Sequence, residues 1–373
     1  MSLSRAPLAT TVVPLHRTII DLAANNKNTS PGIPRTVHVT AWGSPLATAR
    51  YVLFYFGGMP ASAEEPALHS VTAAGTANGD LGPEVPMVVD IYKERHIHLI
   101  AIDKPGMGLS EWKYRYSIRN DWPAIVHHVA EHYGVVQVQD DETSTTQSDG
   151  GVADVTNGTA MSRPSGYGVF GVSNGGPHVM ACLTHPQTAA HVQAAAMIVG
   201  VSDVTASGYF STSHLSGLAE GVFNSLPVAV TGPLNYFLFS IGSLYLFRGG
   251  GYQQIFCDLP ALQNEESKRL LQTVISDGIK NAGLGSAVDC QQGLSPLYAL
   301  PAGQAAARYG AITCPVSLWY GTKDSTVPMH SAEWLHGILP NSTLYKKNTG
   351  HGLFFYHTLE VIDDLIAKMP SRR

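Results

Sequence analysis

The stretch Gly166–His178 reads GYGVFGVSNGGPH and combines an apolar run, a serine flanked by glycines and a proline. The apolar run predicts a strand buried on both faces, and Pro177 suits the first turn of a helix, where no amide donor is needed. Gly171 and Gly175 flank the serine as a sharp strand-to-helix turn requires, because larger residues would clash there. This G-x-S-x-G pattern therefore predicts that Ser173 is an exposed nucleophile.

Two further motifs follow in the order that such a nucleophile requires. Asp324 lies in a turn directly after the apolar run Val316–Tyr320. His351 lies between two glycines, after the run Ser342–Lys346 and before a final helical segment. A lone loop histidine or post-strand aspartate is usually a bystander or a helix cap, but the order Ser, Asp, His at strand ends indicates a catalytic triad. We predict His351 as general base and Asp324 as the acid that orients it.

A second acid stays open at this point. Asp203 follows the predicted strand Ala194–Val199. The carboxyl ends of parallel strands meet at one edge of an open sheet, so this residue could also reach the histidine. Asp203 is the alternative to Asp324.

Backbone donors for a developing oxyanion are also indicated. The Asn174 amide lies at the start of the helix that follows Ser173, where the helix dipole favours negative charge. The strand Tyr51–Phe56 ends in Gly-Gly-Met-Pro, a glycine turn at the same sheet edge. We predict Met59 as the second donor, with Gly58 as its alternative.

Short β-branched and aromatic runs alternate with helical segments along the chain, which is typical of a parallel sheet with helices on both faces. The fold class predicted is α/β, with an eight-stranded, mostly parallel sheet and an inserted, mainly helical cap. The predicted strands are Arg17–Leu22, Arg35–Trp42, Tyr51–Phe56, Ile97–Ile102, Tyr167–Val172, Ala194–Val199, Val316–Tyr320 and Ser342–Lys346.

Two segments interrupt this alternation. Gln139–Gly166 is dominated by Ser, Thr, Gly and Asp, so we expect a mobile surface insertion. Asp203–Tyr309 is rich in Leu, aromatics and Gly and is expected to form the cap, with residues 1–202 and 310–373 as the core. Within the cap, the uncharged stretch Leu226–Phe247 is long enough to span a bilayer, but its prolines, glycine and asparagine favour an apolar pocket wall.

Composition excludes several classes of protein. A formal charge of -5 with scattered basic residues argues against nucleic-acid binding. The four cysteines form no CxxC pair and no secretory leader can be drawn, so a cytoplasmic location is expected. His128-Val-Ala-Glu131-His132 matches a metalloprotease pattern but has no third ligand, so we expect solvated histidines, no metal and no cofactor.

With these motifs in place, the sequence resembles the α/β-hydrolase superfamily, in its capped esterase, lipase and aminopeptidase-like branch. The turns FGGMPAS, AIDKPGMGLS and YGTKDSTVP and the elbow GVSNGGPH are similar to the family motifs. The resemblance covers roughly residues 51–110 and 166–353. Two positions depart from it: Gly57 stands where the family has a histidine, and Lys104 where it has an arginine.

The resemblance implies a serine hydrolase that cleaves a carboxylic ester, or a related acyl bond, of a hydrophobic or lipid-like small molecule through an acyl-enzyme. A proline-iminopeptidase-like peptidase is the first alternative, although no acidic cluster for a substrate amine is evident. A non-catalytic ligand-binding protein of the same fold, or a lyase or perhydrolase that uses the same triad, also stays open. The apolar cap could make peripheral contact with a membrane.

Overall fold

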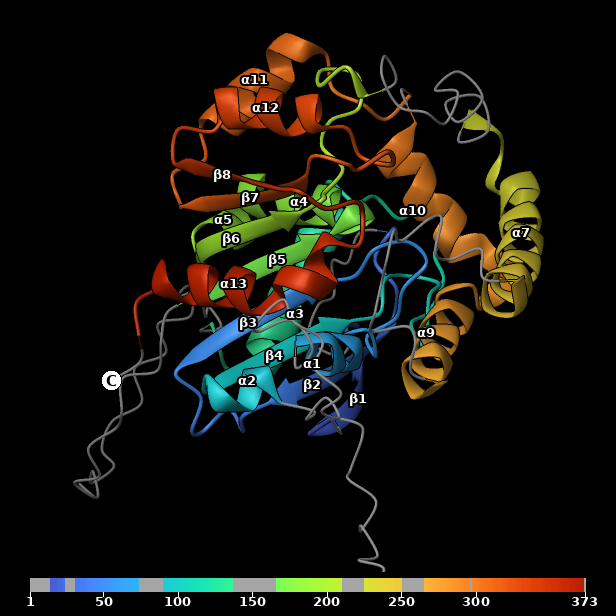
Figure 1. Cartoon of the computed structure of the whole chain (residues 1–373), viewed down its shortest axis with the longest axis horizontal. Helices are drawn as coiled ribbons and strands as arrows, with labels where there is room; N and C mark the ends of the chain where they lie inside the picture. Colours follow the sequence, from blue (N-terminus) through green and yellow to red (C-terminus); the bar gives the residue numbers. More distant parts are fainter. Residues whose placement is uncertain are drawn as a thin grey trace, which may run out of the picture.

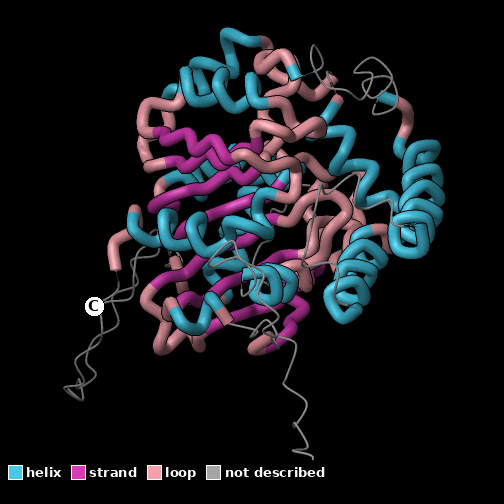
Figure 2. The backbone as a smooth tube through the Cα atoms, in the orientation of Figure 1, coloured by secondary structure: helices cyan, strands magenta, loops and turns pink. Residues whose placement is uncertain are grey.

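The computed structural model describes residues 14–23, 31–73, 90–136, 166–209, 225–249, 265–295 and 297–371. Its centre is an eight-stranded sheet in the order β1-β2-β4-β3-β5-β6-β7-β8 (Figures 1 and 2). The second strand runs antiparallel to both of its neighbours, and all pairs from β4 to β8 are parallel. The predicted fold class is confirmed, with every strand close to its expected bounds. The strands are β1 His16–Asp21, β2 Thr36–Gly43, β3 Tyr51–Phe56, β4 Ile97–Ile102, β5 Tyr167–Val172, β6 Val192–Ile198, β7 Val316–Gly321 and β8 Ser342–Lys347.

Helices cover both faces of the sheet (Figure 1). On one face α1, α2 and α13 pack on the strands, and on the other face lie α3, α4, α5, α11 and α12. Because both faces are covered, the central strands β4, β5 and β7 are buried along their whole length. These helices are α1 Pro66–Ala73, α2 Ile91–Glu94, α3 Asp121–His132, α4 Gly176–Thr184, α5 Pro186–Ala189, α11 Ala302–Gly310, α12 Met329–Ile338 and α13 Leu353–Ala367.

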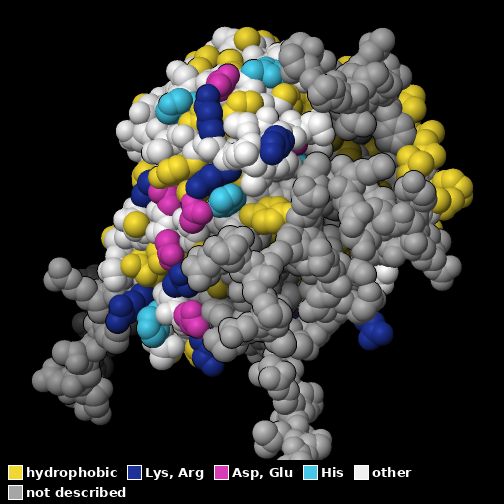
Figure 3. Space-filling model, viewed as in Figure 1, with side chains coloured by type: hydrophobic (Ala, Val, Ile, Leu, Met, Phe, Trp, Pro, Cys, Tyr) yellow, Lys and Arg dark blue, Asp and Glu magenta, His cyan; other side chains and the backbone are white. Residues whose placement is uncertain are grey.

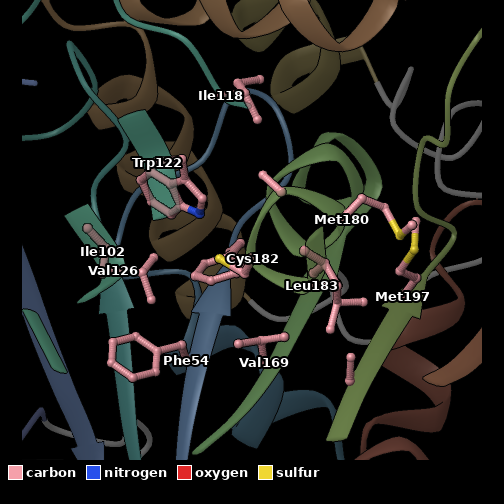
Figure 4. Close-up of a cluster of buried hydrophobic side chains, with 14 of the residues drawn as sticks. Phe54, Ile102, Ile118, Trp122, Val126, Val169, Met180, Cys182, Leu183 and Met197 are labelled. Carbon is pink, nitrogen blue, oxygen red and sulfur yellow. The ribbon is translucent and has the colours of Figure 1, made fainter. Parts of the chain in front are cut away.

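The larger core cluster fills the space between the sheet and α3 and α4. Phe54 and Val169 project from β3 and β5 toward Trp122 of α3 and Cys182 of α4 (Figure 4). All four side chains are fully buried. Burying a large apolar side chain contributes about 1.5–3 kcal/mol, so this cluster holds α4 firmly behind the serine turn at its N-terminus.

Between β6 and β7 the described residues form α7 Val228–Gly249, α9 Glu265–Gly278, the short η4 Asn281–Gly283, α10 Leu284–Leu294 and α11. We call the first four of these the inserted helices. They contact the loops that follow three parallel strands. A Cβ on Gly278 would lie 2.8 Å from the Ala61 amide nitrogen, and Cβ atoms on Gly285 and Gly293 would lie 2.4 Å from the Gly106 carbonyl carbon and 2.2 Å from Asn174 Oδ1. The inserted helices therefore sit against the carboxyl edge of the sheet, whereas α11 packs with α4 and α12.

The predicted surface insertion Gln139–Gly166 lies outside the described residues, apart from Gly166. The apolar stretch Leu226–Phe247 falls mostly in α7, which contains Pro233. Within the described ranges, the helices are too short or too polar to cross a membrane. Several α7 side chains, among them Phe237 and Leu238, are more than half exposed. Hydrophobic side chains gather at the edge of the molecule where α7 lies (Figures 1 and 3).

His69 of α1 is fully buried among aromatic rings. Its Nδ1 lies 2.7 Å from the Tyr92 hydroxyl, and its ring meets that of Phe354 edge-on at a centroid distance of 4.4 Å. Burial lowers the pKa of His69 from 6.5 to about 3. In the unfolded chain His69 therefore becomes protonated below about pH 6.5, whereas in the folded chain it stays neutral down to about pH 3.

We expect His69 to make the fold acid-sensitive. A group with a depressed folded pKa stabilises the fold above its unfolded pKa, and this contribution disappears as pH falls toward the folded value. The free energy of unfolding should fall by up to about 1.4 kcal/mol per pH unit in that range. Urea titrations at pH 7, 6, 5 and 4 should show a shallower decline for His69→Phe, whereas the same substitution at the exposed His336 should leave the slope unchanged. Equal slopes in all three proteins would contradict this.

Candidate active site

The chain turns sharply from β5 into α4 at Ser173. The serine has a backbone φ of 52°, in the left-handed region that side-chain-bearing residues rarely adopt. The turn requires close backbone approach: a Cβ on Gly175 would lie 2.1 Å from the Phe56 carbonyl oxygen, and one on Gly176 would lie 2.3 Å from the Val201 carbonyl oxygen. Real Cβ atoms do not come so close, so only glycine fits at these positions. The turn leaves the Ser173 side chain partly exposed at the carboxyl edge of the sheet.

The structure brings Ser173, His351 and Asp324 together in one hydrogen-bonded chain. His351 Nε2 lies 3.0 Å from the Ser173 hydroxyl oxygen, and His351 Nδ1 lies 2.8 Å from Asp324 Oδ2. The Asp324 side chain is fully buried, and that of His351 is 13% exposed. This is the spacing of a nucleophile, a base and an orienting acid in hydrogen-bond reach of one another.

The turn after β7 fixes the acid. Asp324 Oδ1 accepts the amides of Thr326 at 2.7 Å and Val327 at 3.0 Å, which leaves Oδ2 for the histidine. The same turn is joined to the histidine loop, because the Lys323 amide donates to the Thr349 carbonyl oxygen at 2.9 Å. Acid and histidine are therefore held on two loops that are connected by backbone hydrogen bonds.

Asp203, the alternative acid, has a different environment. Its Oδ2 accepts the Leu300 amide at 2.9 Å and lies 3.9 Å from a guanidinium nitrogen of Arg119. Burial raises the pKa of Asp203, while these partners act in the opposite direction. The structure thus pairs His351 with Asp324 and engages Asp203 elsewhere.

The glycine turn after β3 reaches the serine. A Cβ on Gly58 would be 3.4 Å from the Ser173 Cβ, so the two residues are in contact. The Gly58 amide is directed at the buried carboxyl group of Glu65, whose pKa it lowers against the larger increase caused by burial. In the described part of the chain, the Met59 amide has no hydrogen-bond acceptor.

Glu65 also explains the glycine at position 57. A Cβ on Gly57 would lie 2.6 Å from Glu65 Oε2 and 2.9 Å from the Ala61 Cβ. The space that a side chain at position 57 would need is therefore occupied by a buried carboxyl group. No sequence pattern pointed to Glu65, because its position beside Gly57 depends on how the turn folds back.

The second departure from the family pattern, Lys104, forms a buried ion pair with an inserted helix. Lys104 Nζ lies 2.8 Å from Asp289 Oδ2 of α10, and the two side chains are 3% and 2% exposed. The ammonium group also lies near the carbonyl oxygens of Gly58 at 3.5 Å and Asn174 at 3.4 Å. One cation thus contacts an inserted helix, the serine turn and the glycine turn.

Asp289 also binds Asn174, the residue that follows Ser173. The Asn174 side-chain amide donates to Asp289 Oδ2 at 2.7 Å. His178, one turn further along α4, lies 3.2 Å from Asp289 Oδ1, and burial together with Lys104 lowers the pKa of His178 well below its ordinary value. The ring is therefore neutral, and one lysine balances one aspartate in this buried network.

Removing one member of the Lys104–Asp289 pair should leave the other member buried without an opposite charge beside it. We expect Lys104→Met to lower the free energy of unfolding by about 3–5 kcal/mol, and Lys104→Met/Asp289→Leu to recover most of that loss. The matched control is Lys346→Met, which breaks a pair whose side chains are both 49% exposed and should cost less than about 1 kcal/mol. Urea unfolding of the four proteins checks this, and similar small losses in both single variants would contradict it.

Comparisons with known proteins agree on the fold. No family model matches the chain. Over 83 residues it is 36% identical to a pimeloyl-[acyl-carrier protein] methyl ester esterase of Chromobacterium violaceum, an alignment that spans 22% of this chain and 33% of that protein. The shared part is thus about a third of the length of the curated relative.

Solved structures match over nearly the whole chain. A bromoperoxidase from Bacillus anthracis superposes with a TM-score of 0.55 at 15% identity, covering 95% of this chain and 99% of its own. An esterase from a Rhodococcus species gives 0.55 at 14% identity, with 90% and 96% covered. An alpha/beta hydrolase from a deep-sea metagenome gives 0.53 at 12% identity, with 89% and 94% covered. The chain therefore has the α/β-hydrolase fold, as its motifs indicated.

Proposed function

We propose that this protein is a serine hydrolase that cleaves a carboxylic ester through an acyl-enzyme. The observation that carries the proposal is the continuous chain from Asp324 through His351 to the Ser173 hydroxyl, with distances of 2.8 and 3.0 Å. In this reaction His351 takes the proton as the serine oxygen attacks the ester carbonyl, and the buried Asp324 stabilises the imidazolium that forms. His351 then gives the proton to the departing alcohol.

The oxyanion of the tetrahedral intermediate would be held by the amides of Asn174 and Met59. Asn174 follows the nucleophile in the short 3-10 helix Ser173–Gly175 that leads into α4, where the helix dipole favours negative charge. Met59 is preferred to Gly58 because the Gly58 amide faces Glu65. Water, activated by the same histidine, would then cleave the acyl-enzyme.

The inserted helices would form the cap predicted from the sequence and set the substrate class. Tyr236 of α7 and Ile275 of α9 line a cavity of about 500 Å³, which is in the range of small-molecule sites. Its lining mixes apolar side chains with Ser240, Gln272, Ser276, Lys280 and Asn281. Ser173 and His351 do not line this cavity, and the inserted helices approach the site where the end of α9 packs on the glycine turn at Pro60.

Labelling by a fluorophosphonate and hydrolysis of a p-nitrophenyl ester series should both depend on Ser173. We expect Ser173→Ala to abolish labelling and to lower kcat by about 10³–10⁶-fold, because removing a triad nucleophile leaves only binding and oxyanion stabilisation. Ser44→Ala, at a buried serine near the opposite edge of the sheet, should retain both signals. Folded wild-type protein that neither labels nor turns over any ester would sink the proposal.

The acid assignment can be tested with one substitution at two positions. Asp324→Asn should lower kcat by about 10⁴-fold, because the amide favours the wrong histidine tautomer. Asp203→Asn should leave kcat within a few-fold of wild type, since Asp203 is engaged by the Leu300 amide. The reverse order of effects in a steady-state ester assay would assign the acid to Asp203.

A further inference from the structure

A second cavity lies where the segment after α10 meets the core, and we call it the seam cavity. Its lining includes Gln292 from the end of α10, Tyr298 from the segment after it, Thr184 from α4 and Arg308 from α11. Ser173 and His351 do not line it. Its volume of about 90 Å³ admits a group of a few heavy atoms rather than a large ligand.

The charged groups that line the seam cavity are two arginines and one aspartate. Arg119 donates to the Tyr298 carbonyl oxygen at 2.7 Å and lies 3.9 Å from Asp203. That carboxylate already accepts the backbone amides of Leu300 and Ala206. Arg308 is half-buried and has neither an ion pair nor a hydrogen bond with any described residue. The cavity therefore carries an excess positive charge.

A buried hydroxyl group adds a neutral donor. Ser202, between β6 and Asp203, lines the cavity and is 3% exposed, and its Oγ has no hydrogen-bond partner in the described ranges. Most buried polar groups are paired, so an unpaired one beside a cavity indicates a missing partner. The neighbouring Gln292 is different, because its Oε1 already accepts the Ile118 amide at 2.6 Å.

The positive charge on Arg308 is partly buried and lies near the Arg119 guanidinium, so it destabilises the fold. Burial and the nearby Arg119 guanidinium lower the pKa of Arg308 below its ordinary value. Arginine stays protonated in proteins, so this cost is borne by the fold unless an anion offsets it. A guanidinium binds oxyanions with two parallel N–H donors, which suits carboxylate and phosphate groups alike.

We propose that the seam cavity binds a small oxyanion, of the carboxylate or phosphate type, between Arg119 and Arg308, with the Ser202 hydroxyl as a further donor. The bound anion would bridge the segment after α10, through the Arg119–Tyr298 hydrogen bond, to α11 of the core. It would thereby secure the end of the inserted helices without entering the site at Ser173. This inference does not depend on the ester hydrolysis proposed above.

Thermal unfolding with inorganic phosphate, and separately with sodium acetate, tests the proposal at ionic strength matched with sodium chloride. At least one anion should raise the Tm of the wild type in a saturable way that chloride does not reproduce, because ligands that bind only the folded state stabilise it. The stronger of the two identifies a phosphate-type or a carboxylate-type site.

Arg308→Gln should bind that anion more weakly, with a dissociation constant at least tenfold higher than that of the wild type, as measured by calorimetry. Without the anion this variant should be as stable as the wild type or more stable, since it removes an uncompensated charge. Arg50→Gln, at an exposed arginine just before β3, is the matched control and should bind as the wild type does. No saturable shift in the wild type, or the same affinity in Arg308→Gln, would overturn the proposal.

If Arg308→Gln does not fold, Arg308→Lys serves in its place. This variant should bind the anion more weakly than the wild type, and unchanged affinity would again overturn the proposal.

Discussion

The close approach of three strand ends at the serine turn is the constraint on which the site depends. Ser173 can adopt its left-handed backbone only because Gly175 lies against the end of β3 and Gly176 against the segment after β6. The same contact places the glycine turn after β3 beside Ser173. A backbone strain of about 1–3 kcal/mol at one residue is held by a core that buries large side chains around it.

Much of this arrangement could be predicted from the sequence because its signals are local. Each parallel strand is a short apolar run, and each site residue follows such a run in a glycine-containing turn, as Asp324 and His351 do. Parallel topology then brings those turns to one edge. The eight strands and the contact among the three side chains follow from this logic, and their catalytic roles stay a proposal.

The residues that lie against Lys104 and Gly57 could not be predicted from the sequence in the same way. Lys104 and Asp289 are 185 residues apart, and nothing near either one indicates the other. Glu65 lies only a short distance along the chain from Gly57, yet its carboxyl group fills the space beside that glycine because of the way the turn folds. Each departure from the family motif therefore lies against a second residue that the motif does not contain: Gly57 lies against Glu65, and Lys104 pairs with Asp289.

The buried pair between Lys104 and Asp289 also limits which inserted segments can be transplanted into this protein from others of the same fold. Inserted segments of α/β-hydrolases are attractive units for chimeras, because they connect to the core at two points of the chain. Here a transplanted segment without an acid at the position of Asp289 would leave an ammonium group buried beside the serine turn. A productive chimera must replace Lys104 together with the segment, because one partner without the other is a buried, unpaired charge.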